Sequence, residues 1–265
     1  MKNKFIKTFH ALLLPISFIL ILVLLNTVPL TNINKYGSGA IFITIIAFMI
    51  TFIALKIDQK TFKEIGFYLD RKTPIRFSIG FTLGLIITIT MLTIIINFSS
   101  IEMIYNQNAN LPTILFWLLA FFPLAFMEEI IFRGYAFSKI YKNIGIWPAQ
   151  ILMAILFAWY HDFTGVTLLN QLLGPGTWAL IYGVAVVKSK GIALPTGLHM
   201  AINAVLAIFG EKDDRHAIWN LEYSTEITPI LQSQTENIGI FMQLCILVIG
   251  IILTENLRRK SAKNQ

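Results

Sequence analysis

The chain has 265 residues, of which 56% are hydrophobic and only 13% are charged, and its mean hydropathy is +0.70. Ordinary soluble domains carry about 25% charged residues, so this composition excludes a typical soluble protein and predicts a polytopic membrane protein. Cys245 is the single cysteine, which excludes a disulfide framework and a CxxC metal or redox motif. The formal net charge of +7 has to be interpreted from the position of the basic residues relative to the membrane spans.

Eight apolar runs predict the architecture. A helix of about 20 apolar residues crosses the ~30 Å hydrocarbon core of a bilayer, so we expect an all-α protein with about eight transmembrane helices in one bundle. The fifth, sixth and seventh runs are short, and a short helix crosses when it continues into the interface or is sheltered by its neighbours. The expected spans are Phe9–Leu30, Gly39–Leu55, Phe77–Ile96, Leu111–Phe132, Trp147–His161, Thr177–Val187, Leu194–Phe209 and Ile238–Leu253.

The basic residues alternate with these spans. Of the 21 lysines and arginines, 18 lie in segments that the eight-helix arrangement puts on the N-terminal side, and only Lys35, Lys212 and Arg215 lie on the other side. Because Lys and Arg accumulate in cytoplasmic loops, we expect both termini to be cytoplasmic, in a bacterial plasma membrane. The net charge then reflects membrane topology, and no nucleic-acid partner is expected.

Three charged residues stand at the end of the apolar fourth run, in the stretch PLAFMEEIIFRGYAF. An ionisable side chain at the centre of a membrane helix costs at least about 2.5–3 kcal/mol on insertion scales, so it usually faces the bundle interior. On a helix Glu129 and Arg133 are one turn apart and can form an ion pair. Glu128 lies about 100° around the helix and is left without a partner. Alternatively, the three charges mark the cytoplasmic end of the helix and snorkel into the interface.

Two further polar groups of residues lie on apolar helices. The stretch FAWYH places Phe157 and His161 one turn apart, and HMAIN does the same for His199 and Asn203. A single histidine on an apolar face is more often a satisfied core residue. Two histidines, an amide and an unpaired carboxylate on three membrane helices each need a polar partner in lipid, and they are most readily one another's partners.

This set of side chains suits water-mediated acyl hydrolysis. A buried carboxylate can act as general base on water, and a neutral imidazole can share that proton. An imidazole and a carboxamide can donate hydrogen bonds to the developing oxyanion. The sequence contains none of the HExxH, GxGD or GxSxG motifs used by other intramembrane proteases.

Three motifs occur in order on the fourth, fifth and seventh predicted helices. EEIIFR (128–133) has the form EExxxR, FAWYH (157–161) the form FxxxH, and HMAIN (199–203) the form HxxxN. Together they resemble the CAAX-protease and bacteriocin-processing family, CPBP or Abi, of intramembrane endopeptidases. The resemblance covers about residues 111–209, which would be the protease core, and the other helices match only as membrane spans. We expect residues 1–265 to form a single integral-membrane domain.

The resemblance implies a role for each motif residue. Glu128 would be the base that activates water, assisted by His161, while His199 and Asn203 would stabilise the oxyanion. The residues expected to support the site structurally are Glu129, Arg133 and Phe157.

Metal use stays open at this stage. Proteins of this kind are commonly described as metalloproteases, and Glu128, His161 and His199 are an acceptable Zn²⁺ ligand set for an open catalytic site. The same residues also serve a metal-free glutamate mechanism. We favour the mechanism without a required cofactor, because Asn203, one turn from His199, suits an oxyanion donor better than a group that supports a metal ligand.

The favoured function is cleavage of a peptide or membrane-associated protein. One alternative is a proton-coupled transporter that uses the Glu/His/His cluster as a relay, although the sequence lacks the repeated pair of broken helices found in transporter halves. A second alternative is a non-catalytic membrane scaffold or immunity protein. The expected partners are a peptide or membrane-protein substrate and the lipid bilayer, and the oligomeric state is left open.

The asymmetry of the basic residues makes a labelling prediction. We expect the connection Gly210–Asn237, which holds six acidic and two basic residues, to lie outside the cytoplasm. A cysteine introduced at Asp213 should react with a membrane-impermeant reagent in intact cells, whereas one introduced at Lys60 should not. The reverse labelling pattern would overturn the proposed topology.

Overall fold

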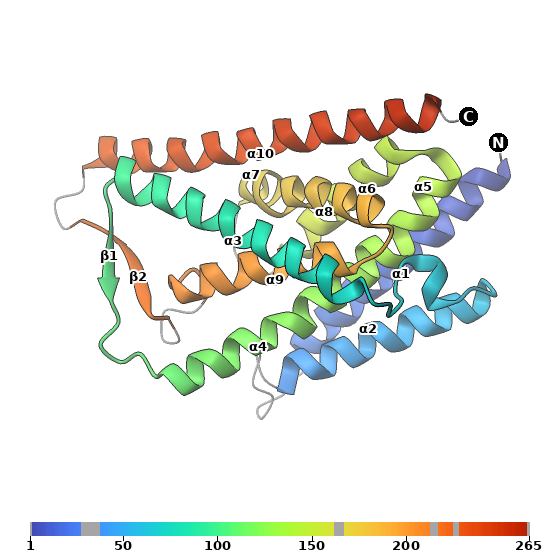
Figure 1. Ribbon diagram of the computed structural model, residues 1–265, viewed down its shortest axis with the longest axis horizontal. Coiled ribbons are helices and arrows are strands. Elements are labelled where there is room, and N and C mark those ends of the chain that lie inside the picture. The colour runs from blue at the N-terminus through green and yellow to red at the C-terminus, as the bar shows by residue number, and fades with distance from the viewer. Residues whose placement is uncertain (1, 28–37, 162–166, 213–216, 225–227, 264–265) are drawn as a thin grey trace.

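The computed structural model describes all residues except 1, 28–37, 162–166, 213–216, 225–227 and 264–265. Most helices run roughly along the long axis of the molecule, and both chain ends lie at the same end of it (Figure 1). The elements in chain order are α1 (Lys2–Thr27), α2 (Ser38–Ile57), the 3₁₀ helix η1 (Phe62–Ile65), α3 (Thr73–Phe98), β1 (Ile101–Tyr105), α4 (Leu111–Glu128), the π-helix η2 (Glu129–Phe137), α5 (Ser138–Ile144), α6 (Ile146–Tyr160), α7 (Leu168–Gln171), the π-helix η4 (Leu172–Gly176), α8 (Thr177–Ser189), α9 (Ala193–Ile208), β2 (Trp219–Tyr223) and α10 (Pro229–Lys263).

The predicted helical membrane architecture is confirmed. Among the described residues, six helical segments are long and apolar enough to cross a bilayer, and two shorter apolar helices, Ile146–Tyr160 and Ala193–Ile208, accompany them. These segments correspond one to one with the eight predicted runs. The three motifs lie on the fourth, fifth and seventh of them, as predicted, and the chain is an integral membrane protein.

Several predicted spans are longer than the sequence pattern suggested. The eighth is Pro229–Lys263 and not Ile238–Leu253, and π-helical turns extend two others. The fourth does not end at Phe132: α4, η2 and α5 form one apolar segment, Leu111–Ile144. The sixth begins at Leu168 and not at Thr177, since the Gly- and Pro-containing stretch Leu172–Gly176 stays helical. Proline cannot make an ordinary helical hydrogen bond, and a π-turn accommodates the irregularity. The short predicted sixth span therefore crosses as a segment of 22 residues.

A small two-stranded sheet was not predicted. Strand β1 pairs antiparallel with β2, from Ile101 opposite Tyr223 to Tyr105 opposite Trp219. The sheet lies at the end of the molecule opposite the chain termini (Figure 1). Residues 210–237, which the sequence suggested to be one polar loop, thus contain β2 and the first turns of α10. The sheet ties the α3–α4 connection to the α9–α10 connection.

Helices α3 and α9 run side by side with their backbones in direct contact. A Cβ added at Gly80 would lie 2.0 Å from Leu194 O, and one added at Gly197 would lie 2.2 Å from Phe77 O. Small residues allow membrane helices to approach this closely, and the resulting packing drives their association. The contact fixes the position of His199, which is two residues beyond Gly197 on α9.

Buried polar side chains also join helices. Gln150 on α6 donates from Nε2 to Leu180 O on α8 at 3.0 Å and to Thr254 Oγ1 on α10 at 2.9 Å. Thr44 on α2 donates to Pro123 O on α4 at 3.0 Å. Within a bilayer such groups need partners inside the protein, so these contacts hold the motif-bearing helices α4 and α6 in the bundle.

Replacing Gly80 by Ala should destabilise the protein, although alanine is the better helix former. The added Cβ would meet Leu194 O at 2.0 Å, so α3 and α9 would have to separate, at a typical overpacking cost of about 1–3 kcal/mol. We expect a lower melting temperature of the detergent-purified protein. Gly239→Ala is the control, because a Cβ there meets nothing within 4 Å. Equal losses at both positions would contradict the role of the α3–α9 contact.

Candidate active site

The EExxxR motif lies on the buried inner part of the fourth segment. Glu128 ends α4, and Glu129 and Arg133 belong to η2, in which every residue is buried. The exposed fraction is 7% for Glu128 and 0% for both Glu129 and Arg133. The alternative in which these charges snorkel at a helix end is therefore wrong. π-helical turns inside α-helices occur frequently at functional sites.

Glu129 makes the closest ionic contacts in this region. Its Oε1 lies 3.0 Å from Nδ1 of His199 on α9 and 3.5 Å from Nη1 of Arg133. The predicted ion pair between Glu129 and Arg133 is present, but the distance between the two groups is too long for a good hydrogen bond. The reason is that η2 is a π-helix, in which residues four apart are aligned differently from those in an α-helix. The shorter contact, with His199, was not predicted. It joins the first motif to the third.

Glu128, which helix geometry left without a partner on its own helix, meets a histidine of another helix, as expected for polar groups in lipid, and also a tyrosine that was not predicted. Its Oε1 accepts a hydrogen bond from the hydroxyl of Tyr160 at 3.3 Å, and its Oε2 lies 3.6 Å from Nε2 of His199. Oε2 makes no hydrogen bond to any residue that the structure describes. His199 thus lies between the two glutamates, with Nδ1 towards Glu129 and Nε2 towards Glu128.

Aromatic rings surround the guanidinium of Arg133. Its central carbon is 4.1 Å from the ring centroid of Phe157 and 4.9 Å from that of Tyr182. Within the described part of the chain, none of its three nitrogens makes a hydrogen bond, so these rings and the charge of Glu129 stabilise it. Desolvated cation–π contacts contribute about 2 kcal/mol. This contact gives Phe157, the first residue of the FxxxH motif, its structural role.

His161 directly follows the last residue of α6. Its Nδ1 lies 2.8 Å from Phe157 O, which favours the tautomer with the proton on Nδ1 and makes Nε2 an acceptor. Its ring meets the Tyr160 ring edge-on, with centroids 4.9 Å apart. His161 therefore adjoins the tyrosine that binds Glu128.

The remaining predicted residue, Asn203, lies on α9 one turn after His199. It is half-buried, and its amide is not hydrogen-bonded to any described residue.

The segment that contains all three motifs, residues 110–205, matches a protein family described as type II CAAX prenyl endopeptidase Rce1-like. We refer to residues 110–205, which are similar to this family, as the Rce1-like segment. The resemblance predicted from the motifs is confirmed, and the family is one of peptidases. No curated protein matches the chain.

The Rce1-like segment does not present a preformed metal site. Among the described residues, no group of three or more His, Cys, Asp or Glu side chains is arranged to hold a metal ion. Of the zinc ligands considered from the sequence, His199 Nε2 and Glu128 Oε2 lie 3.6 Å apart, whereas Nδ1 of His161 faces a backbone carbonyl. We therefore derive no step through a metal.

Two tyrosines of the Rce1-like segment were missed by sequence reasoning. Tyr160 donates to Glu128, and the ring of Tyr182 stacks on His199 with centroids 4.7 Å apart and planes inclined by 20°. Tyr160 is adjacent to His161 in the FAWYH stretch. Because a buried tyrosine hydroxyl needs a hydrogen-bond partner, the sequence could have indicated that Tyr160 belongs to the site. Nothing in the local sequence distinguishes Tyr182 from an ordinary packing residue of α8.

The Glu129–Arg133 pair makes a stability prediction. Arg133→Met should lower the free energy of unfolding by about 3–5 kcal/mol, because it leaves a buried carboxylate without its guanidinium. The double variant Glu129→Gln/Arg133→Met removes both charges and should be more stable than Arg133→Met alone. Melting temperatures of the wild type, both single variants and the double variant complete the cycle. Strictly additive losses would show that the two charges are not coupled.

Proposed function

We propose that this protein is an intramembrane endopeptidase that hydrolyses a peptide bond in a membrane-associated protein or peptide precursor by means of a water molecule activated by Glu128. The observation that carries the proposal is the position of His199 between two buried glutamates, with Nδ1 3.0 Å from Glu129 Oε1 and Nε2 3.6 Å from Glu128 Oε2. Ionisable groups from two helices are costly to gather at membrane depth. The match to a peptidase family supports peptide-bond hydrolysis as the reaction that these groups carry out.

The attacking water binds between Glu128 Oε2 and His199 Nε2. These atoms are 3.6 Å apart, so both can contact one water oxygen at hydrogen-bond distance. The hydroxyl of Tyr160 holds the other carboxylate oxygen of Glu128 at 3.3 Å. The carboxylate is thereby oriented with one oxygen left for the water.

Each bond and proton has an assigned position in the proposed reaction. The water oxygen attacks the carbonyl carbon of the scissile peptide bond while its proton passes to Glu128, with His161 Nε2 sharing that proton. The Asn203 amide and the protonated His199 donate hydrogen bonds to the oxyanion that forms. The proton on Glu128 then passes to the leaving nitrogen as the carbon–nitrogen bond breaks.

The proposed reaction uses no metal. The contact of His199 Nδ1 with Glu129 Oε1 at 3.0 Å and of His161 Nδ1 with Phe157 O at 2.8 Å supports this choice, because each of these two nitrogens already faces a protein acceptor. Glu129 has a positioning role in this scheme: its carboxylate favours the proton on Nδ1 of His199 and stabilises the charged imidazole.

Glu128→Gln should abolish cleavage while leaving the protein folded. Glutamine keeps the shape of the side chain and can still accept the hydrogen bond from Tyr160, but it cannot take a proton from water. We expect a melting temperature within a few degrees of the wild type, and accumulation of uncut precursors when membranes and secreted peptides are compared by mass spectrometry. General-base removal typically reduces the rate by about 10²–10⁴-fold.

Glu129→Gln is the matched control, since it changes an adjacent glutamate whose partners are Arg133 and His199. It should lose stability along with activity. New peptide termini produced by a well-folded Glu128→Gln protein would remove Glu128 as the base. An unchanged peptide profile in both variants would favour the transporter or scaffold alternative.

A further inference from the structure

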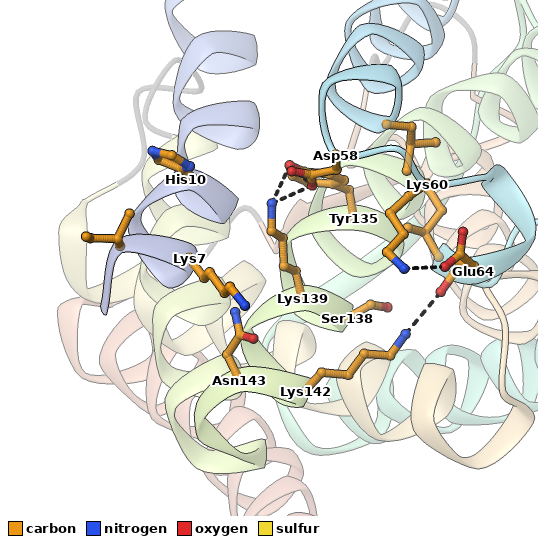
Figure 2. Close-up of a pocket in the computed structure, with 13 residues that line it drawn as sticks. Lys7, His10, Asp58, Lys60, Glu64, Tyr135, Ser138, Lys139, Lys142 and Asn143 are labelled. Atoms are coloured by element: carbon orange, nitrogen blue, oxygen red, sulfur yellow. Dashed lines mark hydrogen bonds and ion pairs between the residues drawn. The ribbon is translucent and has the colours of Figure 1, made fainter. Parts of the chain in front are cut away.

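A second site lies away from the glutamate cluster, at the end of the molecule that holds both chain termini. It is a cavity of about 550 Å³ lined by α1, the end of α2, η1 and the helical segment that continues from η2 into α5 (Figure 2). Among the residues that the structure describes, four lysines and one histidine line it, together with two carboxylates, Asp58 and Glu64. The surplus of positive charge indicates an anionic ligand.

The two carboxylates are already occupied. Asp58 accepts hydrogen bonds from the Tyr135 hydroxyl at 2.7 Å and from Lys139. Burial raises the pKa of Asp58, but the hydrogen bonds from Lys139 and Tyr135 outweigh it and hold this pKa below its ordinary value. Glu64 accepts from Lys60 at 2.7 Å and from the backbone nitrogen of Thr61 at 2.8 Å. Neither acid is left to neutralise the other cations of the cavity.

Several donors in the cavity remain without an acidic acceptor. Lys142 reaches only a backbone carbonyl, Glu64 O, at 3.3 Å, and Lys7 makes no ion pair with a described residue. The amide nitrogen of Asn143 is buried and has no hydrogen-bond partner among the described residues. In Figure 2 the side chains of Lys7 and Asn143 point towards one another, nitrogen to nitrogen. An anion between these two nitrogens can accept a hydrogen bond from each of them.

The depth of the cavity identifies the class of acceptor. The first membrane span begins at Ile6, the second ends at Ile57 and the fourth ends at Ile144. Lys7, Asp58 and Asn143, which line the cavity, each stand next to one of these boundaries. The cavity therefore lies where the apolar spans meet water, which is the level of lipid phosphate groups. Basic pockets between membrane helices at this level bind anionic head groups.

We propose that this cavity binds the phosphate group of an anionic phospholipid, with Lys7, Lys142 and Asn143 donating hydrogen bonds to its oxygens. The bound phosphate would bridge α1 to α5. Because α5 continues directly from η2, the lipid would also brace the helix that carries Glu129 and Arg133.

The test uses the full-length protein in nanodiscs of phosphatidylcholine, with and without phosphatidylglycerol. We expect phosphatidylglycerol to raise the melting temperature and to remain bound in native mass spectra after detergent extraction. Lys7→Gln and Lys142→Gln should each weaken this retention by at least about tenfold, the effect of losing one charge-assisted hydrogen bond. Lys72→Gln is the matched control, since it removes a lysine outside the cavity and should leave retention unchanged.

Asn143→Asp gives a sharper result. If Asn143 donates to a phosphate, aspartate should repel the lipid and abolish the thermal shift. If the amide instead only pairs with Lys7, aspartate should strengthen that pair and leave lipid retention intact, which would overturn the proposal.

Inorganic phosphate and soluble glycerol phosphate form the other arm of the experiment. A thermal shift with phosphatidylglycerol but not with these anions supports the lipid. An equal shift with the free anions would retain the phosphate site but overturn the lipid as its source. No retention above that of phosphatidylcholine, or equal loss in Lys72→Gln, would overturn the site itself. These readouts do not depend on peptidase activity.

Discussion

A guanidinium buried within a membrane bundle has to be neutralised by the protein itself, and this requirement organises the core around η2. Arg133 is fully buried, and its guanidinium lies between aromatic rings and the carboxylate of Glu129. Glu129 in turn faces His199 at 3.0 Å, so α9 has to pack beside η2. The bare backbone contact at Gly80 and Gly197 holds α9 against α3, on the side of α9 that does not carry this polar contact.

The cluster around His199 brings together more acidic than permanently basic side chains. Two carboxylates, Glu128 and Glu129, face one guanidinium, and an imidazole lies between them. Like charges in a low-dielectric interior repel strongly, so a second positive charge is needed if both carboxylates are ionised. Transfer of one proton to or from Glu128 changes the charge of the cluster by one unit.

Much of the fold and the site could be predicted from the sequence. The eight apolar runs correspond to the eight helical segments, because runs of apolar residues favour the bilayer interior and shorter runs are sheltered by neighbouring helices. Periodicity also placed Glu129 and Arg133 on one face. It could not give the longer distance in this pair, since the one-turn rule assumes α-helical geometry and η2 is a π-helix.

The contacts between helices were beyond sequence reasoning for a different reason. The hydrogen bond from Tyr160 to Glu128 and the stacking of Tyr182 on His199 depend on how α6 and α8 pack against α4 and α9. An aromatic residue in an apolar span has the same local signature whether it packs against lipid or against a catalytic group.

One continuous helical segment, Leu111–Ile144, connects the glutamate cluster with the basic cavity. Glu129 and Arg133 lie on its π-helical part, and Lys142 and Asn143 lie on α5 directly beyond it. Loss of a π-turn removes one residue from the helical register and rotates the remainder of the helix by about 100°. The side chains of the cavity and those of the cluster cannot both keep their positions through such a change. A ligand that bridges α1 and α5 would favour the π-helical register if it bound that register more tightly than a register without the π-turn. It would then also favour the present arrangement of Glu129 and Arg133.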